Sequence, residues 1–84
     1  MIRVPLQNNQ AKYDARHDVL HVYLYPSRLS FDDELYPGIV VRRDIDDEDV
    51  ITGLTILDYS KRDSQTLESM LPLFNFAALG NIVH

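Results

Sequence analysis

The chain has 84 residues, no cysteine and a formal net charge of −5. The lack of cysteine excludes disulfides and thiolate metal sites, and the acidic balance argues against binding to nucleic acid or to anionic membranes, which requires positive surface. A domain this short buries only about 60–65% of the surface that it exposes when unfolded, so a second subunit is the expected supplement to its stability.

The N-terminal half predicts an arm followed by two strands. Residues 1–10 mix apolar side chains with Pro5 and a polar Gln7-Asn8-Asn9 stretch, and we treat them as an N-terminal arm. Residues 11–14 are a short predicted strand, and the polar link after them has the length of a hairpin loop. Residues 19–25 are the strongest predicted strand, because they are rich in β-branched and aromatic residues and end at Pro26.

Two more strands are predicted over residues 34–43 and 50–59, with the acidic residues 44–49 as the turn between them. Pro37-Gly38 interrupts the first of these strands and indicates a bulge or an edge position, because proline lacks a ladder donor. Gly53 indicates a bulge or a close approach of two backbones in the second. Four strands with short links favour an antiparallel meander.

The C-terminal part predicts helical structure. A helix is expected over residues 63–71, with the Ser60 hydroxyl as its cap and with Leu67 and Leu71 on one face. Residues 74–79 predict a further helical turn or two, ended by Gly80. The expected fold is therefore α+β: a four-stranded antiparallel β-meander over residues 11–62, with a C-terminal helix and apolar tail, residues 63–84, packed on one face.

Alternation in the strands is incomplete, so both faces of the sheet are expected to be covered. In the strand over residues 19–25, Leu20, Val22 and Leu24 point one way, and valine, histidine and two tyrosines point the other. The C-terminal segment can cover one side, and a second subunit or another protein the aromatic side. Two questions stay open. The tyrosines either form an interface or pair with one another within one sheet. The apolar tail either joins the core or docks across subunits. The interface candidates are Tyr23, Tyr25, Tyr36, Tyr59, Phe74, Phe76 and Leu79.

The residues that could bind a metal ion or take part in catalysis have ordinary structural explanations. An EF-hand loop starting at Asp44 would need glycine at Asp49 and glutamate at Thr55. Residues 44–49 are therefore interpreted as a solvated turn whose carboxylates bond their own backbone. Asp14, Asp18 and His21 could converge where strand ends meet, which leaves a small hydrolase or metal-dependent enzyme as the alternative function. We assign no catalytic, cofactor-binding or metal-ligating residue, and we expect no cofactor.

The order and spacing of several short motifs resemble a known bacterial family, the domain of unknown function 2283. The similarity covers about residues 11–62 and is carried by Tyr13-Asp14, Asp18, Leu20-His21-Val22, Leu24, Gly38-Ile39, Gly53, Ile56-Leu57-Asp58 and Ser60-Lys61-Arg62. The chain departs from the pattern at Asp49, Thr55 and Tyr59, where glycine, glutamate and alanine are usual. The resemblance implies a small α+β domain with no established activity, whose genes sometimes neighbour toxin-like genes.

These observations predict a non-enzymatic interaction module that is homodimeric and binds a protein partner; an antitoxin-like role is one form of this. No apolar run approaches the roughly 20 residues that span a bilayer, and the N-terminus lacks the apolar core of a signal peptide. We therefore expect a cytoplasmic domain that binds neither nucleic acid nor membrane.

Overall fold

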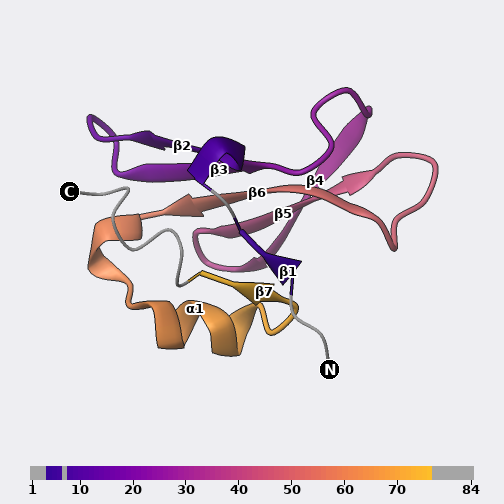
Figure 1. The fold of residues 1–84 in the computed structure, drawn as a ribbon. Coiled ribbons are helices and arrows are strands. Elements are labelled where there is room, and N and C mark those ends of the chain that lie inside the picture. The colour runs from indigo at the N-terminus through magenta and orange to yellow at the C-terminus, as the bar shows by residue number, and fades with distance from the viewer. Residues whose placement is uncertain (1–3, 7, 77–84) are drawn as a thin grey trace.

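Strands make up most of the regular structure in a computed structural model of the chain, which describes residues 4–6 and 8–76 (Figure 1). The described elements follow in chain order: β1 Val4–Pro5, a 3-10 turn η1 Asn8–Gln10, β2 Ala11–Asp14, β3 Val19–Tyr23, β4 Ser30–Tyr36, β5 Ile39–Asp44, β6 Ile51–Leu57, a 3-10 turn η2 Tyr59–Lys61, α1 Ser64–Met70 and β7 Phe74–Asn75.

The main sheet of the described residues has five antiparallel strands in the order β2-β3-β6-β5-β4. The predicted four-stranded meander is therefore wrong in two respects. The predicted strand over residues 34–43 is the β4–β5 hairpin, and β6 lies between β3 and β5 instead of at an edge. The strands are antiparallel as expected, but neighbours in the sheet are not always neighbours in sequence.

The Pro37-Gly38 pair makes the turn of the β4–β5 hairpin. Tyr36 pairs with Ile39, so Pro37 and Gly38 form the whole loop. Gly38 has φ 81°, which favours glycine, and proline before glycine is the usual composition of a type II turn. The Arg62 guanidinium donates to the Pro37 carbonyl at 3.1 Å and to the Leu57 carbonyl at 2.8 Å, which ties this turn to the segment before α1.

Helix α1 occupies the predicted range to within one residue, but its cap differs from the prediction. Asp63 is the N-cap, and its Oδ1 accepts the Thr66 N–H at 2.7 Å. Ser60 lies in η2 instead of capping the helix. Local spacing thus located the helix, whereas the choice between two capping residues three positions apart depended on where the chain leaves the sheet.

The segment after α1 is a strand where further helix was predicted. β7 pairs in parallel with β1, with Val4 opposite Phe74, and the Leu6 N–H donates to the Asn75 carbonyl at 3.1 Å. Part of the predicted arm, residues 1–10, is therefore an ordered strand. Residues 77–79 of the predicted second helix lie outside the described residues.

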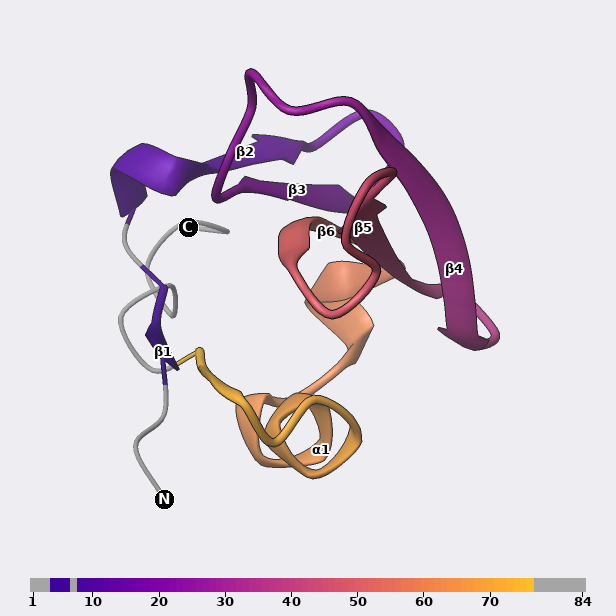
Figure 2. The ribbon, with the colours of Figure 1, turned by 90° about the vertical axis from the view of Figure 1, so that its right-hand side faces the viewer.

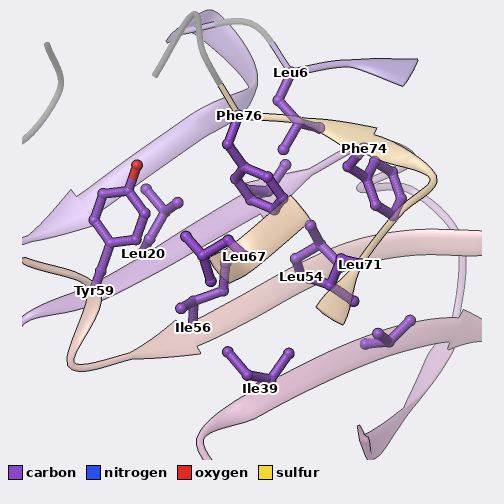
Figure 3. Packing of buried hydrophobic residues seen from close by; sticks show 12 residues of the cluster. Leu6, Leu20, Ile39, Leu54, Ile56, Tyr59, Leu67, Leu71, Phe74 and Phe76 are labelled. Carbon is purple, nitrogen blue, oxygen red and sulfur yellow. The ribbon is translucent and has the colours of Figure 1, made fainter. Parts of the chain in front are cut away.

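The core lies on the concave side of the sheet, which curves around α1 and β7 (Figure 2). We call this side the inner face. Side chains from β3, β5 and β6 pack there against side chains from α1 and the segment after it (Figure 3). Leu67 on the predicted C-terminal helix and Leu71 at its end are buried in this cluster, on one face of the sheet. The buried apolar residues are Leu6, Leu20, Val22, Ile39, Val41, Leu54, Ile56, Tyr59, Leu67, Leu71, Phe74 and Phe76.

Across residues 4–6 and 8–76, no helix has the length and apolar character that a membrane-spanning helix needs.

Candidate functional site

Asp18 is the centre of a hydrogen-bonded cluster that joins the β2–β3 hairpin to η2. The Tyr13 hydroxyl donates to Asp18 Oδ1 at 2.6 Å, and the Ser60 N–H donates to the same oxygen at 2.9 Å. The Ser60 hydroxyl donates to Oδ2 at 2.7 Å, and the Tyr59 N–H donates to the Asp18 carbonyl at 3.1 Å. Asp18 has φ 55°, a left-handed conformation that aspartate tolerates better than most residues. One side chain therefore connects segments 42 residues apart.

The pKa shifts in this cluster indicate that Asp18 stabilises the fold and is not a general base. The Tyr13 hydroxyl, then the Ser60 hydroxyl and amide, hold the pKa of the Asp18 carboxyl below its ordinary value of 3.8. The hydrogen bond to Asp18 raises the pKa of Tyr13. A general base for chemistry near neutral pH needs a pKa close to the working pH, and a carboxylate held in its ionised form this way does not have one. The Ser60 hydroxyl is thus paired with an acceptor that is poorly suited to activate it.

Replacing Asp18 with asparagine is expected to reduce stability and to flatten its acid dependence. Because the folded-state pKa is lowered, the carboxylate contributes stability that is complete above the ordinary value of 3.8 and is lost as the pH falls through the folded-state pKa. Thermal unfolding followed by circular dichroism at neutral pH and at about pH 3 measures both effects. The Asp18→Asn variant should unfold at a lower temperature than the wild type at neutral pH, with a smaller difference in acid.

Asp58→Asn is the matched control for this comparison. Asp58 has the same left-handed backbone, φ 54°, and its side chain makes no capping hydrogen bond. This variant should unfold like the wild type at both pH values. An Asp18→Asn variant with the full acid dependence of the wild type would show that the cluster does not stabilise the fold.

The structure does not bring Asp14, Asp18 and His21 into one site. Asp14 Oδ1 accepts two backbone N–H groups of the hairpin loop at 3.1 and 3.2 Å, and its Oδ2 lies 2.8 Å from His17 Nδ1. His21 lies on β3, with its ring stacked on that of Tyr23 at a centroid distance of 6.3 Å. In the part of the chain that the structure describes, no three histidine or carboxylate side chains gather closely enough to hold a metal ion.

The acidic residues 44–49 form a turn whose carboxylates bond their own backbone, as the sequence predicted. Asp44 Oδ1 accepts the Asp46 N–H at 2.9 Å, and Asp47 Oδ1 accepts the Asp49 N–H at 3.1 Å. Asp44 is buried, and the Arg28 guanidinium donates to its Oδ2. The Asp46 amide and then Arg28 lower the pKa of the Asp44 carboxyl. This turn is therefore anchored at Asp44 and exposed beyond it.

The convex side of the sheet, which we call the outer face, carries apolar and aromatic side chains that the core does not use. Register pairs His21 with Thr55 and Thr55 with Val40, which places these three on one face across β3, β6 and β5. Tyr23 and Leu57, at opposite ends of the same face, are 40% and 42% exposed. The central side chains of the outer face are Val19, His21, Tyr23, Val40, Thr55 and Leu57.

Charged residues border this apolar centre on both sides. Lys12 of β2 pairs with His21, and Glu34 of β4 pairs with Val40, so both belong to the outer face. Arg42 and Asp32 lie on the same face, with Arg42 Nε 3.2 Å from Asp32 Oδ1. An apolar centre with a polar border is the usual anatomy of a protein interface.

The predicted interface residues divide between the surface and the core. Tyr23, Tyr25 and Tyr36 are exposed, whereas Tyr59, Phe74 and Phe76 are buried within the single chain. Leu79 lies outside the described residues. The two phenylalanines of the tail pack in the buried core of the single chain.

Tyr25 does not share the outer face with Tyr23, although their spacing predicts that it should. The N–H groups of Leu24 and Tyr25 both donate to the Thr52 carbonyl, at 2.9 and 3.0 Å, so β3 ends at Tyr23 and the alternation stops. Tyr25 instead borders a depression of about 420 Å³ together with Leu73 and Phe74.

Sequence reasoning missed Val40 and Thr55 as members of the outer face. The prediction of one strand over residues 34–43 gives no separate β5 on which to place Val40. Its face follows once β5 is a separate strand that starts after the turn. The signal was present in Pro37-Gly38, whose composition suits a turn better than a bulge.

The sequence pattern of one protein family matches residues 10–60, which is more than half of the chain. The family is described as a protein of unknown function, DUF2283. The matched region contains the whole five-stranded sheet and the Asp18 cluster. No curated protein and no solved structure gives a significant match to the chain. The chain therefore belongs to the DUF2283 family of proteins of unknown function.

Proposed function

We propose that the domain is a non-catalytic protein-binding module that forms a homodimer through the outer face of its sheet. The observation that supports this most strongly is the composition of that face. A sheet with one side in water normally alternates apolar and polar residues, yet the outer face has valine, histidine, tyrosine and leucine at its centre. Burying these side chains against a second copy would supplement the small core of a single subunit.

The chemistry of the polar residues favours binding over catalysis. The carboxylates of Asp14 and Asp18 accept bonds from backbone amides and hydroxyls of the same chain, which orders the hairpin and η2. His21 contributes an aromatic ring to the outer face, stacked on Tyr23. These side chains therefore already have structural roles at the positions where an enzyme would need free acids and bases.

The curvature of the sheet limits which strands can take part in the dimer. Because the outer face is convex, two copies that pack face to face touch first at the middle of the sheet (Figure 2). The order β2-β3-β6-β5-β4 places β6 in the middle, with β3 and β5 beside it. Tyr23 is the largest exposed side chain on these three strands, and tyrosine is among the residues that most often dominate the affinity of an interface.

Replacing Tyr23 with arginine is expected to weaken dimerisation by at least about tenfold, because a charged side chain would replace the aromatic anchor. Sedimentation equilibrium over a range of protein concentrations gives the dimer Kd of the wild type and of the variant. Tyr25→Arg is the matched control: the change is the same and the residue is similarly exposed, but it lies off the outer face.

The control variant should dimerise within about twofold of the wild type, since surface changes outside an interface have small effects. Equal Kd values for the Tyr23→Arg variant and the wild type would place any dimer interface elsewhere. A wild type that stays monomeric at all concentrations would remove the homodimer from the proposal.

A protein partner other than a second copy is the wider form of this proposal. An antitoxin-like domain would bind one cognate protein, and the acidic balance of this chain, with a net charge of −5, favours a basic partner. The outer face has charges of both signs at its border, so it does not by itself select such a partner.

A further inference from the structure

Strand β4 forms one edge of the sheet and has an unusual share of exposed apolar side chains. In the strand order it has a neighbour, β5, on one side only (Figure 2). Phe31, Leu35 and Tyr36 on the strand and Leu29 just before it are all at least 40% exposed. An edge strand offers backbone N–H and C=O groups to a further strand, and apolar side chains there favour its addition.

The part of β4 that can accept another strand is short and regular. Its register with β5 runs evenly from Ser30 opposite Asp44 to Glu34 opposite Val40, and it shifts between Glu34 and Tyr36. Such a bulge bends a strand and ends regular pairing. The available edge is therefore Ser30 to Glu34, in which three consecutive residues are acidic.

A depression of about 400 Å³ adjoins this edge on the inner face and is rich in carboxylates. It is lined by Phe31, Asp33, Arg43, Glu48 and Asp49. Phe31 pairs with Arg43 and Asp33 with Val41, which places both β4 side chains on the side of the depression. A strand added beside β4 would place every second side chain next to this depression.

The charges in the depression are only partly balanced within the chain. Arg43 Nε lies 3.0 Å from Asp33 Oδ2, and Arg43 Nη1 donates to the Glu48 carbonyl at 3.0 Å. The carboxylates of Glu48 and Asp49 have no hydrogen bond or ion pair with any residue that the structure describes. Three acidic residues and one arginine thus line the depression, and the two unpaired carboxylates favour a positively charged side chain.

A second copy of this chain is a poor occupant of the same edge. If two β4 strands paired antiparallel about Asp33, Asp33 would face its own copy and Asp32 would face Glu34. Registers displaced by one residue still place acidic residues opposite each other. Like charges directly opposite in a sheet are destabilising. The edge therefore discriminates against self-pairing, unlike the outer face.

We infer that β4 binds an extended basic segment of a partner protein as an added strand, with lysine or arginine side chains over the depression formed by Phe31, Asp33, Arg43, Glu48 and Asp49. The inference rests on the proposed role as a protein-binding module, but it uses a surface separate from the outer face. Backbone hydrogen bonds along Ser30 to Glu34 provide the docking, and the unpaired carboxylates of Glu48 and Asp49 provide the selection for basic residues.

The probe for this inference is a fluorescein-labelled peptide of alternating lysine and valine, long enough to cover Ser30 to Glu34. Fluorescence polarisation with the full chain at physiological salt measures its Kd, because salt at that level suppresses attraction between distant charges. Two control peptides separate the contributions: one with glutamate in place of lysine, and one with the lysine sequence N-methylated throughout, which keeps the charge but removes the backbone donors. We expect only the first peptide to bind.

Paired variants of the same turn test where the peptide binds. Glu48→Gln with Asp49→Asn removes the two unpaired carboxylates, and Asp46→Asn with Asp47→Asn removes the same net charge from positions that do not line the depression. The first double variant should weaken binding by about tenfold and the second by less than about twofold. Amide hydrogen exchange should show new protection in Ser30 to Glu34 when the lysine peptide is present.

Several outcomes would overturn the inference. These are an absence of saturable binding at millimolar peptide, equal binding of the N-methylated peptide, equal losses in the two double variants, or new protection confined to β2, β3 or β6. Sedimentation of the same double variants keeps this result separate from the proposed dimer. They retain the whole outer face, so a failed peptide experiment with an intact dimer would contradict the β4 inference alone.

Discussion

Replacing Phe74 with alanine should lower the free energy of unfolding by about 3–5 kcal/mol, the range typical of a buried phenylalanine. Phe74 is 2% exposed and packs among the buried residues between α1 and the sheet. It is also one of the two residues of β7, and it pairs with Val4 of β1. Small domains have total stabilities near the lower end of about 5–15 kcal/mol, so this variant is expected to be partly unfolded at ambient temperature. Urea unfolding measures the loss.

Leu73→Ala is the control for this change, because Leu73 is the neighbouring residue and is 41% exposed. It should lower stability by less than about 1 kcal/mol. The unfolding should be repeated at two protein concentrations. A loss for Phe74→Ala that appears only at the higher concentration would mean that Phe74 packs across subunits, which contradicts its place in the core of one chain.

Gly53→Ala is expected to lower stability by about 1–3 kcal/mol through overpacking in the central strand. A Cβ at position 53 would lie 2.6 Å from the Val22 carbonyl oxygen on β3, a separation that real Cβ atoms hardly ever have. The Arg42 side chain on the other side is at an ordinary 3.8 Å, so the clash is with the backbone of β3 alone. Relief would require β3 and β6 to move apart.

Thr55→Ala is the comparison for Gly53→Ala, because Thr55 lies two positions along the same strand and on the same face. Its effect should stay below about 1 kcal/mol, the span of strand propensities. Thermal unfolding of the two variants distinguishes a steric clash from a general sensitivity of β6. Equal stabilities for Gly53→Ala and the wild type would show that the two strands can separate without cost.

The parts of the fold that follow from local sequence were predicted well. β2, β6 and α1 lie within the predicted ranges, and the acidic turn over residues 44–49 has the expected bonds from carboxylate to backbone. Gly53 was predicted as a bulge or a close approach, and the structure shows the close approach to Val22. Most of these features depend on residues near one another in sequence. The prediction at Gly53 depends on a general property of strands, in which glycine often marks a bulge or a close approach of another backbone.

The predictions that were wrong concern features that depend on contacts between residues distant in sequence. Nothing local shows that β6 pairs with both β3 and β5, or that Ser60 bonds Asp18 instead of capping α1. Likewise the pairing of β1 with β7 joins residues near the two ends of the described chain. The turn at Pro37-Gly38 is a different case: its signal is local, but the pair was predicted to be a bulge or an edge position within one strand, whereas it forms the turn between two strands.

Several motifs that carry the family resemblance connect separate segments of the fold. Tyr13, Asp18 and Ser60 belong to one hydrogen-bonded cluster, and Arg62 holds the turn at Gly38. A Cβ at Gly38 would lie 2.7 Å from the Arg62 guanidinium, so this turn and this arginine are packed together. Several of the matching residues therefore hold the fold together, and only His21 and Leu57 among them are also central side chains of the outer face.

The candidate surface was predicted in part. Alternation places Val19, His21 and Tyr23 on one face, and the structure confirms their position. Tyr25 was placed with them wrongly, because the shared acceptor at Thr52 ends the alternation of β3 after Tyr23. A break of this kind arises from the partner strand, so the sequence of β3 alone contains no sign of it.

The most direct test of the proposed dimer is a dilution series of the wild-type chain followed by NMR. We expect chemical-shift changes that grow with concentration and that are largest for the side chains of the outer face, Val19, His21, Tyr23, Val40, Thr55 and Leu57. Spectra that do not change with concentration, or changes confined to Tyr25 and Leu73, would contradict it.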